Sequence, residues 1–161
     1  MIDAVTVFIA DDQSDHQVDL ACWDRLARNV LRTEGVHGAA EMALTFVDEV
    51  TIADLNRRYM GSDGPTDVLS FPIDGELRHS PEAGDMPLML GDVVICPVVA
   101  ARNAPDHAGN LEDEIALLVV HGILHLLGFD HMEDEERRVM QAREQDLLVA
   151  FHGEPARNPW S

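Results

Sequence analysis

The chain has 161 residues, of which 46% are hydrophobic, and a formal net charge of −19 from 30 acidic and 11 basic side chains. This length and apolar fraction are typical of one folded domain with a core of its own. Every basic residue is an arginine, which excludes lysine Schiff-base chemistry and a P-loop, and the acidic balance argues against general affinity for nucleic acid.

Strand and helix patterns follow one another along the chain without a repeat or a linker. The range 51–59 is expected to form a short helix with Thr51 as its N-cap, and Asn110 is the expected N-cap of the helix at 112–127. The polar range 73–87 should form a surface loop. The predicted elements are strands at 4–9, 41–47, 68–71 and 88–95, and helices at 18–31, 51–59, 112–127 and 134–151, with a further helix starting at Pro97.

The order βαβαββααα predicts a single-domain α/β (α+β) fold, in which helices pack on a four-stranded mixed sheet. Met42, Leu44 and Phe46 should share the buried face of their strand, and Met140, Leu147 and Phe151 the buried face of the last helix. We expect residues 1–152 to form the domain and residues 153–161 a frayed tail.

Three histidines near the end of the predicted 112–127 helix have the spacing of a metal site. His121 and His125 are four residues apart, so they lie on one face of a helix. Gly128 can end that helix and let the chain bring His131 back to the same ion. Three neutral imidazoles with an open fourth position are a common catalytic zinc arrangement.

Gly122 sets this motif apart from the metalloprotease pattern H-E-x-x-H-x-x-G-x-x-H. It occupies the position of the glutamate that serves as general base, whereas the other defined residues of the pattern are present. The metal site can survive this change, but peptide hydrolysis loses its proton acceptor. We therefore expect a zincin-like metal-binding helix that serves a different hydrolysis.

The histidine segment HGILHLLGFDH resembles a motif of the YbeY family of bacterial metal-dependent endoribonucleases. Further blocks of the chain match that family in the same order: Leu55-Asn56 with Tyr59, the range 64–72, the range 91–97, and the acidic helix after His131. The resemblance thus covers most of the chain.

This resemblance implies a small single-domain fold related to zincins, with one zinc ion held by His121, His125 and His131. It implies cleavage of single-stranded RNA in maturation of the 3′ end of small-subunit ribosomal RNA, and a link to ribosome quality control. The partners that it implies are small-subunit ribosomal proteins and a ribosome-associated GTPase.

One departure concerns RNA binding. Many family members carry an arginine directly after the tyrosine of the L-N-x-x-Y block, where this chain has Met60. Arg57 and Arg58 lie just upstream and are the candidates to supply the missing charge. Arginine suits this role because its planar fork grips phosphate at two points.

Asp130, beside the third histidine, allows two interpretations. As a catalytic group it would orient a ligand or accept a proton from the activated water. As a structural group it would accept hydrogen bonds from backbone N–H groups of the turn.

Two functions from different classes remain open from the sequence. The first is a zinc-dependent endoribonuclease, which the open three-histidine site favours. The second is a ribosome-assembly binding factor with a mainly structural zinc, which Met60 and the charge of −19 favour. With no membrane-length apolar stretch and no basic secretion signal, either would be cytoplasmic, without a membrane partner.

Overall fold

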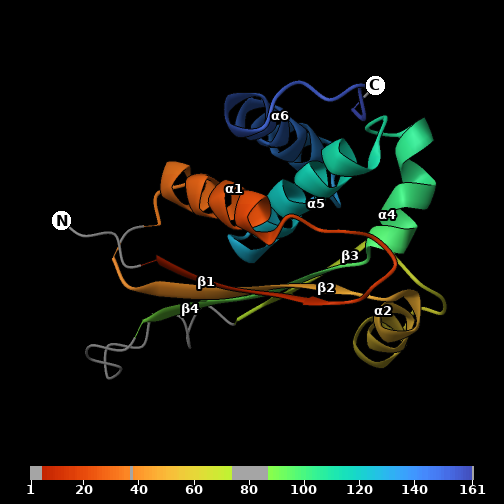
Figure 1. The fold of residues 1–161 in the computed structure, drawn as a ribbon. Coiled ribbons are helices and arrows are strands. Elements are labelled where there is room, and N and C mark those ends of the chain that lie inside the picture. Colours follow the sequence, from red (N-terminus) through yellow and green to blue (C-terminus); the bar gives the residue numbers. More distant parts are fainter. Residues whose placement is uncertain (1–4, 37, 74–86, 161) are drawn as a thin grey trace.

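The computed structural model describes residues 5–36, 38–73 and 87–160. Its elements follow the predicted order, with a one-turn π-helix η1 after α2 and a short 3-10 helix η3 after α4 (Figure 1). They are β1 (Val5–Asp12), α1 (Leu20–Thr33), β2 (Ala40–Val47), α2 (Glu49–Leu55), η1 (Asn56–Met60), β3 (Val68–Pro72), β4 (Leu88–Ile95), α4 (Pro97–Asn103), η3 (Ala104–Asp106), α5 (Leu111–Leu126) and α6 (Asp134–Phe151).

The four strands form one mixed sheet in the order β1-β2-β4-β3. β1 pairs in parallel with β2, and β2 in parallel with β4, whereas the edge strand β3 runs antiparallel to β4. The predicted single-domain α/β fold with a mixed sheet is therefore confirmed. Most of the predicted surface loop, residues 74–86, lies outside the described residues.

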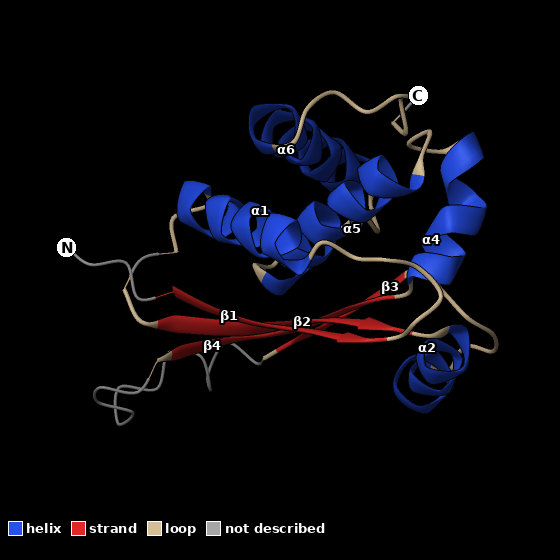
Figure 2. Cartoon of the chain, in the orientation of Figure 1, coloured by secondary structure: helices blue, strands red, loops and turns tan. Residues whose placement is uncertain are grey.

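The helices cover the two faces of the sheet unequally. Helices α1, α5 and α6 lie above the sheet in Figure 2, whereas α2 lies below one end of it. The predicted inward row Met42, Leu44 and Phe46 is buried, as alternation along β2 requires. Helix α5 contacts α1, α4, α6, β3 and β4, which explains why its sequence is apolar on nearly every side.

Local hydrogen bonds fix where α5 and α2 begin. The carboxamide of Asn110 accepts from the Asp113 backbone N–H at 2.9 Å, so Asn110 caps α5 as predicted. The predicted cap of α2 is wrong: Asp48, with an extended backbone, accepts from the Thr51 N–H at 2.8 Å. The helix therefore starts earlier than expected and ends in the π turn of η1.

The C-terminal part of the chain differs from two expectations. Phe151 is 39% exposed rather than inward. The segment 153–160 is held against the domain instead of fraying: in Figure 1 it runs from α6 back over α5 toward α4. The Ala156 N–H donates to Asp113 at 2.9 Å and the Arg157 N–H to the Ala108 carbonyl at 2.9 Å.

Within the described residues, no helix combines the length and apolar character needed to cross a membrane.

Candidate metal centre

The structure brings the three motif histidines together at the C-terminal end of α5. Gly128 has a φ of 102°, and its N–H donates to the His125 carbonyl at 3.1 Å, which ends the helix. The chain then turns and brings the third ring to the other two. The ring centroids are 4.7 Å apart for His121 and His125, 5.5 Å for His121 and His131, and 4.9 Å for His125 and His131. One nitrogen from each ring lies within 4.8 Å of the other two.

A buried carboxylate holds the first of these rings. His121 Nδ1 lies 2.6 Å from Oε1 of Glu144, a residue of α6 that is 5% exposed. The other oxygen of Glu144 accepts from the indole Nε1 of Trp160 at 3.0 Å. Metal-binding histidines commonly donate a hydrogen bond from the N–H of their second ring nitrogen to a carboxylate, which fixes the ring and its tautomer. With Nδ1 engaged in this way, His121 presents Nε2 to the cluster.

The surroundings of His125 favour its neutral form. Burial, followed by the neighbouring His121 and His131 rings, lowers the pKa of His125 below its ordinary value. The neutral form is the one that binds a metal ion, because protonation removes the lone pair that coordinates it. The donor set of three imidazoles, one of them oriented by a buried carboxylate, therefore fits a metal ion.

The cluster borders an open hollow of about 360 Å³, which we call the histidine cleft. The edge strand β3 and the residue before it form the opposite wall, with Asp67 and Ser70 among the lining residues. Ser70 also ties this wall to α5, because its hydroxyl donates to the Gly122 carbonyl at 3.2 Å. The sequence did not single out Glu144 as a site residue. The carboxylate of Glu144 within the apolar stripe of Met140 and Leu147 was the one available signal for it.

Gly122 faces the sheet and not the histidine cleft. A Cβ atom at this position would lie 2.6 Å from Val93 Cγ1 and 3.3 Å from Ser70 Oγ. The glycine therefore allows α5 to pack closely on β3 and β4. A glutamate here would have to displace the sheet, so the metalloprotease pattern is incompatible with this packing.

Asp130 is not among the residues that line the histidine cleft. Its carboxylate is exposed and accepts from the His131 backbone N–H at 2.7 Å. It lines a separate hollow together with Gly128, Phe129 and Glu133. This placement favours the structural interpretation, in which Asp130 shapes the turn that carries the third histidine.

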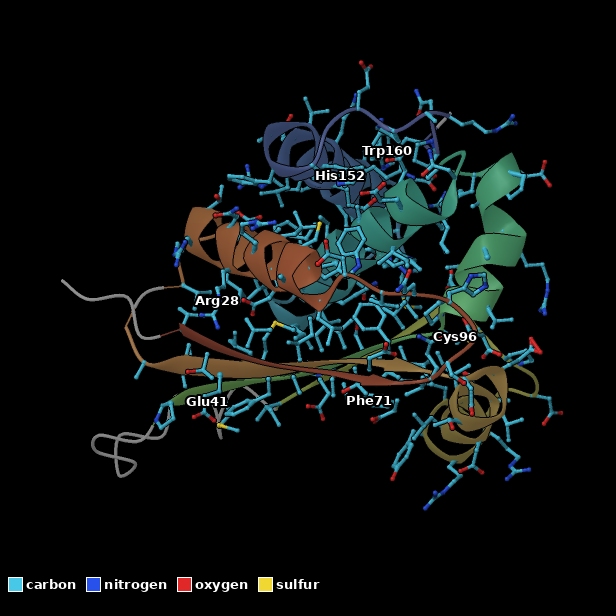
Figure 3. All side chains as sticks on the ribbon, viewed as in Figure 1. Arg28, Glu41, Phe71, Cys96, His152 and Trp160 are labelled. Carbon is cyan, nitrogen blue, oxygen red and sulfur yellow. The ribbon has the colours of Figure 1, made fainter. Side chains whose placement is uncertain are left out.

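The two candidate RNA-binding arginines lie on η1, outside the lining of the histidine cleft. Arg57 and Arg58 both pair with Asp54, at 2.7 and 3.3 Å, and their side chains are 67% and 60% exposed. Tyr59 beside them packs edge-on against Phe71 of β3, whose position is labelled in Figure 3. Because Phe71 and Ser70 are consecutive on β3, they point to opposite faces of the sheet. Tyr59 therefore packs on the face of the sheet opposite to the one on which Ser70 contacts α5.

Comparisons with known proteins agree with one another. The family model described as Endoribonuclease YbeY matches residues 8–152. The Endoribonuclease YbeY of Salinispora tropica is 44% identical over 151 residues, which cover 91% of this chain and 96% of that relative. That of Thermobifida fusca is 50% identical over 127 residues, covering 79% and 82% of the two chains.

A solved structure has a similar fold. The solution structure of a protein from Thermotoga maritima superposes with a TM-score of 0.62 at 27% sequence identity, covering 92% of this chain and 91% of that one. The fold, the histidine motif and the sequence relatives therefore lead to one conclusion: this chain belongs to the Endoribonuclease YbeY family.

Proposed function

We propose that this chain is a zinc-dependent endoribonuclease that cuts single-stranded RNA during 3′-end maturation of small-subunit ribosomal RNA. The observation that carries the proposal is the cluster of His121, His125 and His131 beside an open cleft. A structural zinc site is usually closed by four protein ligands, mostly cysteines. Here both cysteines, Cys22 and Cys96, are free and outside the cluster.

Each residue of the site has a role in this proposal. His121, His125 and His131 would hold the ion, and Glu144 orients His121 through the 2.6 Å contact. When bound, zinc supplies Lewis-acid activation of water and stabilises charge on the scissile phosphate. Asp67 lines the histidine cleft opposite the rings, so we assign its carboxylate the role of accepting a proton from the attacking water.

RNA must approach a strongly acidic protein, so its binding requires a local basic surface. Arg57 and Arg58 are exposed on η1 at the end of the molecule where β3 begins. We assign them contacts with phosphates away from the cleavage point, because they lie outside the histidine cleft. Their pairing with Asp54 would be exchanged for pairing with phosphate, which arginine binds through two parallel hydrogen bonds.

The charge of −19 favours a second role for the outer surface. An acidic exterior complements basic proteins, so the proposed partners are small-subunit ribosomal proteins, with a ribosome-associated GTPase in the same cytoplasmic assembly. Such contacts would place the enzyme in ribosome quality control. They would also serve a ribosome-assembly binding factor whose zinc is mainly structural.

The test compares zinc content and cleavage of single-stranded RNA in the wild type, His125→Ala and His16→Ala. The proposal predicts about one zinc per wild-type chain and chelator-sensitive cleavage, both lost in His125→Ala. His16 lies outside the cluster, so its substitution controls for removal of a histidine. Zinc binding without cleavage in the wild type would favour the binding factor. Undiminished cleavage by His125→Ala would refute a catalytic metal.

A further inference from the structure

We infer that the histidine cleft continues into a pocket that binds a nucleobase next to the scissile phosphate. This inference rests on the proposed function and names the part of the RNA that the site would recognise. The pocket has a volume of about 350 Å³, within the range of about 300–1,000 Å³ found for small-molecule sites. We call it the base pocket.

The base pocket and the histidine cleft adjoin. They share four lining residues, Asp67, Val68, His121 and His131. A phosphate held at the histidines would thus have the base pocket directly beside it. In RNA the base is joined to the phosphate through a single ribose, so a phosphate at one position and a base at the other are compatible with one nucleotide.

The lining of the base pocket suits a flat ring with polar edges. Its floor is apolar, with Leu117, Leu118 and Met140 all buried. Gln141 adds a carboxamide, which can both donate to and accept from the edge of a base. Arg137 also lines the pocket; its side chain is 51% exposed and lies 3.8 Å from Asp134, which leaves it accessible to a neighbouring phosphate.

Trp160 provides the aromatic side of the pocket. Its indole is fixed by the hydrogen bond to Glu144, and it lies in the helical layer above the sheet (Figure 3). Stacking of a base on an aromatic side chain is worth about 1–3 kcal/mol and tolerates every base, because each base has a π-face. A base can enter such a pocket only after leaving its helical stack, so the pocket selects single-stranded RNA.

Binding of nucleoside 5′-monophosphates by the zinc-loaded protein tests the inference, with ribose 5-phosphate as the matched ligand without a base. Calorimetry gives the affinities, and tryptophan fluorescence locates the base, because Trp23 is only 3% exposed and Trp160 is the other tryptophan. We expect the nucleotides to bind about tenfold or more tightly than ribose 5-phosphate and to quench Trp160.

Two substitutions on α6 localise the effect. Gln141→Leu should reduce the preference for nucleotides over ribose 5-phosphate, whereas Gln145→Leu, at an exposed position of the same helix, should leave it unchanged. Equal affinity for the two ligands in the wild type, or an unchanged preference in Gln141→Leu, would overturn the inference.

An RNA cleavage assay on the same preparation separates this inference from the proposed function. If the protein cleaves RNA but binds nucleotides no more tightly than ribose 5-phosphate, the proposed catalysis stands and the base pocket is refuted. If the protein binds nucleotides more tightly than ribose 5-phosphate but does not cleave RNA, the base pocket is supported and the proposed catalysis is refuted.

Discussion

The Nδ1 atom of His121 lies 2.6 Å from the buried Oε1 atom of Glu144, and this contact joins the histidine helix α5 to the last helix α6. The opposite oxygen of the same carboxylate accepts from Trp160 at 3.0 Å. Both oxygens are thus engaged, which satisfies a carboxylate that would otherwise be costly to bury. The position of the first histidine therefore depends on a residue of α6 and on the C-terminal segment.

Replacing the carboxylate of Glu144 should weaken metal binding. In Glu144→Gln the side chain keeps its size but loses the charge that holds the Nδ1 proton of His121. Loss of such a partner typically costs about 10–100-fold in metal affinity. Competition with a chromophoric chelator measures this affinity directly. Glu136→Gln, at an exposed position of the same helix, is the matched control and should bind zinc like the wild type.

Asp67→Asn tests the proposed proton acceptor. The change should lower RNA cleavage by about 10²–10⁴-fold, the usual contribution of a general base, while zinc content stays at the wild-type level. Asp63→Asn, a matched change at an exposed position outside the histidine cleft, should leave cleavage unaltered. A wild-type cleavage rate in Asp67→Asn would assign the proton transfer to another group.

The parts of the fold that local sequence determines could be predicted. Alternation placed Met42, Leu44 and Phe46 on one buried face, and Asn110 was recognisable as the cap of α5 because it acts on the following turn. The approach of His121, His125 and His131 could be predicted for the same reason. A helix places the first two on one face, and Gly128 permits the return of the third.

Long-range contacts escaped prediction because they depend on how the elements dock. Glu144 meets His121 only once α6 has packed on α5, and Trp160 meets Glu144 only once the C-terminal segment has folded back. Nothing in the spacing of these residues indicates the pairing. The role of Gly122 likewise depends on the distance between α5 and Val93 of β4, which no helical pattern reveals.

Gly122→Ala should destabilise the protein although alanine is the better helix former. The helix gains up to about 1 kcal/mol from its intrinsic propensity. The new methyl group would lie 2.6 Å from Val93 Cγ1, and overpacking of this kind costs about 1–3 kcal/mol. Urea unfolding should therefore show a lower midpoint than the wild type.

A double-mutant cycle with Val93→Ala supplies the control for Gly122→Ala. Removing the methyl groups that the new Cβ would meet should relieve the clash, so the double variant should be more stable than the sum of the single effects predicts. Additive effects would mean that α5 shifts away from the sheet instead of clashing with Val93.

The exposed arginines of η1 should account for part of the salt dependence of RNA binding. Substitution of both Arg57 and Arg58 by alanine removes two candidate phosphate contacts, so the slope of log affinity against log salt should flatten by up to about two. Zinc content should not change, because both side chains lie outside the histidine cleft. Met60→Arg adds a charge on the same turn and should strengthen binding.

Arg25→Ala, at an exposed position on α1, is the control for loss of an arginine and should leave the slope of log affinity against log salt unchanged. Unaltered RNA affinity in both η1 variants would place the RNA surface elsewhere, and contacts with basic proteins would then be the main route by which this acidic chain meets the ribosome.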